Sequence, residues 1–139
     1  MAYLGLDLGS KTLGVSVSDN SNIIASPFEV IRYNNYEELL KRLEEIIKLK
    51  NITKIILGNP LNMNGSPSKR TEISLEFKNI LENKFNIEVI MQDERLSTVE
   101  AENILISNNT RRNNRKKVID KMASTIILQT YLDRSNNEK

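Results

Sequence analysis

Apolar and polar residues alternate along two short runs near the start of the chain, between Tyr3 and Asp19. Successive side chains of a β-strand point to opposite faces, so the leucines of segment 4–8 share one face while Gly5 and Asp7 share the other. The two runs predict a β-hairpin with a loop of about five residues. An ionised carboxylate in such a strand is costly to bury unless it is paired, hydrogen-bonded or bound to a metal. Asp7 is therefore a candidate functional residue.

Hydrophobic periods of two and 3.6 residues, separated by turn-forming residues, divide the rest of the chain into seven further elements. Pro27 confines its strand to a sheet edge or marks a bulge, and Ser97 with Glu100 forms a capping box that begins a helix. We expect strands at 23–31, 54–58 and 87–94, and helices at 36–50, 68–85, 97–108 and from about Arg115 or Lys116 onward.

Three of these helices carry apolar stripes that we expect to face a sheet. The stripe of helix 36–50 consists of Leu39, Leu40, Leu43, Ile46 and Ile47. The stripe of helix 68–85 consists of Ile73, Phe77, Ile80 and Leu81. The stripe of the last helix consists of Ile119, Met122, Ala123, Ile126 and Thr130, with Asp120 at its edge. Three strands followed by alternating helices and strands predict an α/β fold: a central mixed five-stranded sheet, its first three strands antiparallel, with helices on both faces.

Composition narrows the class of protein further. A length of 139 residues suits a single domain, 1–139, and 39% hydrophobic with 27% charged residues is ordinary for a globular protein. No apolar run approaches the roughly 18 residues that a membrane span needs, so we expect a cytoplasmic protein without membrane contact. The chain has no cysteine and no histidine, which excludes disulfides, typical zinc sites and a Ser-His triad.

Positive charge is concentrated in one segment, 111–117. It leaves the remainder with a net charge of −3, against +2 for the whole chain. Such a run is either a solvated face or a site for nucleic-acid phosphates. The five basic side chains of the segment are Arg111, Arg112, Arg115, Lys116 and Lys117.

Acidic residues recur at positions that a mixed sheet could bring together. Glu94 follows the strand 87–94, and sites of open α/β sheets form at the carboxyl ends of parallel strands. With Asp7 and Asp120 it supplies three carboxylates, which suit hard divalent cations such as Mg²⁺ or Mn²⁺. Two such ions about 4 Å apart can cleave a phosphodiester. Each acid also has a structural alternative: a buried hydrogen bond for Asp7, an ion pair with Arg95 for Glu94, and the N-terminal helix dipole for Asp120.

Four motifs in order resemble one bacterial family over nearly the whole chain: "LGLDLGSKTLGVSVSD", "ILGNPLNMNGS", "DERLSTVEAENIL" and "RKKVIDKMASTIILQTYL". The chain resembles the YqgF family, also called RuvX-like, of the ribonuclease H-like superfamily. The resemblance implies a ribonuclease H-like nuclease domain with Asp7, Glu94 and Asp120 as catalytic metal ligands, Asp93 remaining open. Thr12 departs from the basic residue that the family usually has there, while Lys11 is retained. We expect nucleic acid to contact Lys11, Lys69, Arg70, Arg95 and the basic run.

The leading hypothesis is a metal-dependent endonuclease that acts on structured RNA, most of all the 5′ end of precursor 16S rRNA. A Holliday junction resolvase with the same chemistry, and a non-catalytic RNA-binding assembly or transcription factor, are the alternatives. An actin-like ATPase is disfavoured because one domain supplies only half of its nucleotide cleft. Expected partners are RNA or branched DNA and ribosomal precursor particles, with the chain itself a monomer or weak homodimer.

Overall fold

The computed structural model describes residues 2–60, 68–93 and 112–137, with the side chains of 93, 112–121 and 137 outside the description. The expected helix 97–108 and its capping box therefore lie outside the described residues. The elements in chain order are β1 (Ala2–Leu8), β2 (Thr12–Ser18), β3 (Ala25–Arg32), α1 (Tyr36–Lys50), β4 (Ile52–Asn59), α2 (Lys69–Phe85), β5 (Glu88–Asp93) and α4 (Arg112–Asn137).

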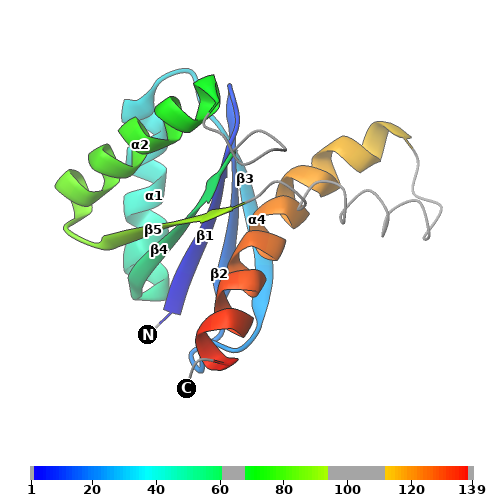
Figure 1. The fold of residues 1–139 in the computed structure, drawn as a ribbon. Helices are drawn as coiled ribbons and strands as arrows, with labels where there is room; N and C mark the ends of the chain where they lie inside the picture. The colour runs from blue at the N-terminus through cyan, green and yellow to red at the C-terminus, as the bar shows by residue number, and fades with distance from the viewer. Residues whose placement is uncertain (1, 61–67, 94–111, 138–139) are drawn as a thin grey trace.

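The five strands form one mixed sheet in the order β3-β2-β1-β4-β5. β1 pairs antiparallel with β2, and β2 with β3, whereas β1 pairs parallel with β4, and β4 with β5. Helices α1 and α2 cover one face of the sheet and α4 covers the other (Figure 1). The predicted α/β fold with three antiparallel strands first and helices on both faces is confirmed.

The third strand shows both features that its proline predicts. β3 is an edge strand that pairs with β2 alone, a position where proline is tolerated in a sheet. Its register with β2 also shifts between Val15 and Ser16, at the point where Ser16 faces Pro27. The edge position and the irregularity therefore occur together.

Side chains at the helix ends explain where α1 and α2 begin and end. The side chain of Asn35 accepts a hydrogen bond from the Glu38 amide at 2.9 Å, and Asn51 ends α1 with a left-handed φ of 52°. Ser68 and Thr71 cap α2 reciprocally. The expectation for Ile73 was wrong: it is 48% exposed, because the buried face of α2 is centred on Phe77 and Leu81.

Helix α4 begins at Arg112, about three residues before the predicted start, and its buried face also differs from the prediction. Ala123, Ser124, Ile127, Leu128 and Leu132 are buried, whereas the predicted Ile126 is only half-buried and Thr130 is exposed. The reason is close packing on β1. A Cβ at Gly5 would lie 2.7 Å from the Leu128 Cβ and 2.9 Å from the Ser124 carbonyl oxygen. The fit of Ser124 and Leu128 against Gly5 therefore defines the face of α4 that meets the sheet.

A membrane-spanning helix is absent from the part of the chain that the structure describes, since none there is both long and apolar enough.

Candidate active site

Asp7 lies near the carboxyl end of β1, where it pairs with Gly14 of β2 and is half-buried. Because β1, β4 and β5 are parallel, their carboxyl ends meet at one edge of the sheet. β4 ends at Asn59 and β5 at Asp93, the residue before Glu94. The fold therefore has the expected edge, at which the carboxyl ends of β1 and β5 lie on the same side of the sheet.

Asp7 belongs to a row of three residues across the parallel strands. Leu6 pairs with Leu57, so the next step of the register brings Gly58 beside Asp7, and Gly58 itself pairs with Gln92. All three positions lie on the sheet face covered by α4, since Ile56 and Ile90, two residues before Gly58 and Gln92, pack into the cluster with Leu128. Gly58 is buried and contributes no side chain to this row between Asp7 and Gln92.

Gln92 is a site candidate that sequence reasoning missed. It is only 8% exposed, although an uncharged amide is costly to bury without hydrogen bonds. The sequence did carry a signal, which was the spacing. Gln92 and Glu94 are two positions apart, so in a strand they share one face, as Gly5 and Asp7 do.

Helix α4 runs antiparallel to β1 over this face. The Ser16 hydroxyl donates a 2.9 Å hydrogen bond to the Ser124 carbonyl oxygen next to Gly5, and the rings of Tyr3 and Tyr131 lie 6.2 Å apart further toward the start of β1. Moving along β1 from Tyr3 toward Asp7 therefore means moving back along α4. Position 120 is four residues, about one helical turn, before Ser124. The helix thus brings the backbone of Asp120 toward the Asp7 end of β1.

The other predicted acids and the basic run can be located only in part. Glu94, Arg95 and Arg111 lie outside the described residues. So do the side chains of Asp120 and of the basic residues Arg112, Arg115, Lys116 and Lys117, whose backbone forms the first turns of α4. Within the described ranges no three acidic side chains come together as a metal site. Coordination by the predicted triad therefore remains a prediction.

Three of the four predicted basic residues outside the run are described, and all three are exposed: Lys11, Lys69 and Arg70. The Arg70 guanidinium donates a 2.6 Å hydrogen bond to the Leu8 carbonyl oxygen. Arg70 thereby ties the start of α2 to the end of β1, one residue after Asp7. A guanidinium has five N–H donors, so this bond leaves donors for a further ligand.

The turn after β1 is held by several hydrogen bonds. The Gly9 amide donates to the Thr12 carbonyl oxygen at 2.7 Å, and the Tyr33 hydroxyl donates to the Gly9 carbonyl oxygen at 2.7 Å. The Tyr33 amide also donates to the Lys11 carbonyl oxygen at 3.1 Å. These contacts fix the loop that carries Lys11 relative to Asp7.

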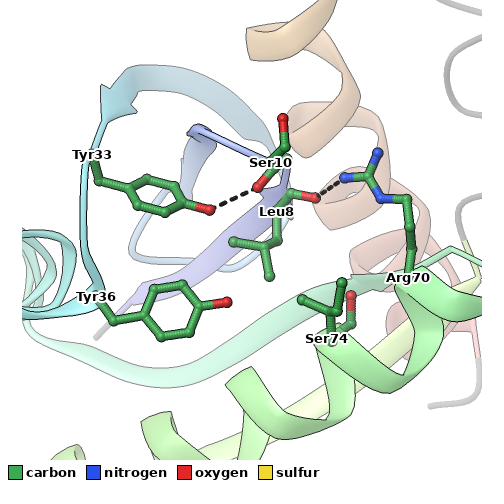
Figure 2. A pocket seen from close by; sticks show the side chains of 8 residues that line it. Leu8, Ser10, Tyr33, Tyr36, Arg70 and Ser74 are labelled. Carbon is green, nitrogen blue, oxygen red and sulfur yellow. Dashed lines mark hydrogen bonds between the residues drawn. The ribbon is translucent and has the colours of Figure 1, made fainter.

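A cavity of about 350 Å³ opens beside this turn (Figure 2). Leu8 lines it, and Asp7, the preceding residue of β1, faces the other side of the sheet. The cavity's lining residues are Leu8, Gly9, Ser10, Tyr33, Tyr36, Arg70, Ile73 and Ser74. Burial raises the pKa of the Tyr33 hydroxyl, which the Tyr36 hydroxyl also raises and Arg70 lowers. Burial raises the pKa of Tyr36 too, with a smaller effect from Glu76. Both tyrosines thus keep their protons at neutral pH. No local sequence pattern distinguishes them from ordinary half-buried tyrosines.

The sheet and its helices define a ribonuclease H-like fold of the RuvC type. Thermus thermophilus RuvC in complex with a Holliday junction substrate superposes with a TM-score of 0.59, covering 97% of this chain and 96% of the other at 12% identity. The Holliday junction resolvase of fowlpox virus superposes with a TM-score of 0.54, at 16% identity, 96% of this chain and 99% of the other.

The chain belongs to the family described as RuvX, Holliday junction resolvase, which matches residues 1–134. A relative from Bacillus subtilis strain 168 is 50% identical, covers 98% of this chain and 100% of its own length, and is named "Putative pre-16S rRNA nuclease". A relative from Leuconostoc mesenteroides with the same name is 51% identical over 96% of this chain and 95% of its own.

Proposed function

We propose that this protein is a metal-dependent endonuclease that cleaves phosphodiester bonds at the 5′ end of precursor 16S rRNA. The observation that carries the proposal is the row formed by Asp7, Gly58 and Gln92 at the carboxyl edge of the sheet, in a chain that belongs to the RuvX family. We infer that residues 1–139 act as one nuclease domain, in the cytoplasm, where ribosomal precursors are made.

The residues at this edge fit a hard divalent cation. Asp7 offers a half-buried carboxylate, and the neighbouring position in the row is Gly58, which adds no side chain of its own. Glu94 follows directly on β5 and Asp120 lies one turn before Ser124 on α4, so the proposed ligands come from three elements that the fold directs to one edge. Oxygen donors of this kind suit Mg²⁺ or Mn²⁺. When two ions are bound, they supply water activation and stabilisation of the leaving oxygen.

The chain's own basic residues position the substrate in this proposal. Lys11, Lys69 and Arg70 are exposed around the end of β1, and the backbone of 112–117 forms the first turns of α4 at the same end of the sheet. Phosphate contacts of this type fix the register of a nucleic acid without reading its sequence. They would hold the scissile bond near Asp7.

RNA is favoured as the substrate because the relatives at 50% and 51% identity both carry the pre-16S rRNA name. A junction resolvase is the second candidate, supported by the description of the family. Resolution of a four-way junction needs two active sites facing opposite strands, so it requires a dimer. A strictly monomeric protein in solution would count against the resolvase. RNA binding that is indifferent to the acids and to Mg²⁺ would instead indicate a non-catalytic assembly factor.

Side-by-side cleavage assays test the proposal, with precursor 16S 5′-end RNA and a synthetic four-way DNA junction as substrates and Mg²⁺ or Mn²⁺ present. We expect metal-dependent cleavage of the RNA by the wild type and its loss in Asp120→Asn. Asp133→Asn is the matched control, an exposed acid on the same helix whose carboxylate accepts a 2.9 Å hydrogen bond from Gln129. Retained cleavage by Asp120→Asn would refute the assigned site, and cleavage of the junction alone would establish the resolvase.

A further inference from the structure

We propose that the cavity beside the β1–β2 turn binds one unpaired base of the RNA substrate, from a nucleotide next to the cleaved phosphodiester. The inference rests on the proposed nuclease function and assigns that function a base-binding subsite. The cavity and the acid belong to consecutive residues, since Leu8 lines the cavity and Asp7 precedes it on the opposite face of the sheet. An RNA strand that passes over the turn 9–11 would reach both.

The cavity has the surfaces that a flat aromatic ligand needs. Leu8 and Ile73 provide apolar walls, and Ile73 is 48% exposed although it belongs to a well-formed helix. The rings of Tyr33 and Tyr36 point into the cavity from one side and Arg70 lies on the other, with Leu8 between them (Figure 2). Unpaired RNA bases are recognised by stacking on aromatic rings or guanidinium planes and by hydrogen bonds to their edges.

These walls are already fixed in position. The Tyr33 hydroxyl is bound to the Gly9 carbonyl oxygen, and the Arg70 guanidinium to the Leu8 carbonyl oxygen. The ring of Tyr36 lies 5.9 Å from that of Tyr33 and 5.4 Å from the buried ring of Phe77. Side chains that are held in this way lose little further conformational entropy when a ligand binds.

Size and charge indicate a nucleotide in a polyanionic strand. A volume of about 350 Å³ is near the lower limit of about 300 Å³ for ligand pockets, which suits a single base. The exposed Lys11 and Lys69 neighbour the lining residues Ser10 and Arg70 in sequence, whereas Glu76 lies near Tyr36. The phosphates are therefore directed to the side of the cavity formed by the β1–β2 turn, and that turn connects to Asp7.

Fluorescence of 2-aminopurine tests the inference, with the probe placed singly at each nucleotide around the cleavage site of the precursor RNA. Binding is measured without metal, so that no cleavage occurs. Ile73→Glu introduces a carboxylate at the cavity, and Leu75→Glu is the matched control: the same charge change on the same helix, at a residue that is 45% exposed and outside the cavity lining. We expect one probe position to respond, and the response to be lost in Ile73→Glu alone. The affinity should fall about tenfold, as for the loss of one stacked base.

An abasic nucleotide at the responding position makes the test specific. It should weaken wild-type binding as much as Ile73→Glu does, and combining the two changes should add almost nothing, because both remove one interaction. Tyr36→Leu should behave like Ile73→Glu, with its thermal unfolding recorded to confirm folding. Additive effects, or equal binding by Ile73→Glu and Leu75→Glu, would overturn the subsite, and in the latter case α2 would be open to a protein partner.

Two further outcomes separate this inference from the proposed function. If the wild type cleaves the RNA but the effects of the abasic nucleotide and of Ile73→Glu are additive, the nuclease function stands and the subsite is refuted. A wild type that neither binds nor cleaves the RNA refutes the proposed function itself. Adenosine monophosphate is titrated in parallel, and its binding at the cavity without competition from the RNA would also overturn the inference, since the site would then serve a free nucleotide.

Discussion

The hydroxyl of Ser16 donates a 2.9 Å hydrogen bond to the Ser124 carbonyl oxygen, which joins β2 to α4 across residues 108 positions apart. The contact is possible because Gly5 lies between the two elements with no side chain. It sets the height of α4 above the sheet, and with it the distance between Asp7 and the turn of α4 that carries Asp120.

Gly5→Ala should therefore destabilise the fold strongly. The new Cβ would lie 2.3 Å from the Ser16 Oγ and 2.9 Å from the Ser124 carbonyl oxygen, so α4 would have to move. Overpacking of this kind costs about 1–3 kcal/mol, occasionally more. Denaturant unfolding measures the loss, with Ser26→Ala on the exposed surface of β3 as the control. An unchanged midpoint would show that α4 adapts without cost.

Asp7→Asn should abolish cleavage and leave RNA affinity within about threefold of the wild type, because only the charge that holds the cation is removed. Chelation of divalent ions should abolish wild-type cleavage in the same way. Gel-shift and cleavage assays on one preparation separate the two effects. Cleavage by Asp7→Asn at the wild-type rate would remove this residue from the site.

Lys54 should stabilise the fold at the opposite end of α4. Its Nζ lies 5.1 Å from the Tyr3 ring centre, 5.8 Å from that of Tyr131 and 3.3 Å from the Tyr131 hydroxyl oxygen. Lys54→Met keeps most of the aliphatic contact and removes the charge, so we expect a loss of about 1 kcal/mol. Lys41→Met, at an exposed position of α1, is the control for the change of charge. Equal unfolding free energies for the two variants would contradict a cation–π role.

Asp19 should make the turn between β2 and β3 sensitive to acid. Its carboxylate accepts hydrogen bonds from the amides of Ile23 at 2.8 Å and Ile24 at 3.2 Å, and these bonds lower its pKa from 3.8. Because the folded pKa is the lower one, the stabilisation is present above pH 3.8 and is lost as the pH falls through the folded value. Thermal unfolding of wild type and Asp19→Asn between pH 5 and 2 should show the steeper decline in the wild type. Parallel curves would refute the role of this carboxylate.

The basic segment should dominate the salt dependence of RNA binding. Replacing Arg111, Arg112 and Arg115 by Gln should reduce the slope of log affinity against log salt by about 0.7 for each single-strand phosphate that the variant no longer neutralises. Lys48→Gln, at an exposed position on α1 where the lysine pairs with Glu44 at 3.2 Å, should leave the slope unchanged. Equal slopes for the triple variant and the wild type would assign the run to a solvated face.

The sequence determined the elements whose causes are local. Alternating apolar and polar residues specify the strands. Asn35 and Ser68 are the N-caps of α1 and α2, and each accepts a hydrogen bond from a backbone amide three residues further along. Asp7 was also identified locally, as a carboxylate on a strand face that its neighbours leave clear. These features depend on residues a few positions apart, so one sequence is enough to predict them.

Tertiary structure decided the features that depend on distant residues meeting. The sheet-facing side of α4 is set by the fit of Ser124 and Leu128 against Gly5, which hydrophobicity alone misplaced. The exposure of Ile73, the burial of Gln92 and the cavity formed by β1, α1 and α2 likewise follow from contacts across elements. Protein interiors are packed so closely that the absence of one Cβ, as at Gly5, changes which side chains fit against it. A local sequence pattern cannot predict which distant residue will fill that space.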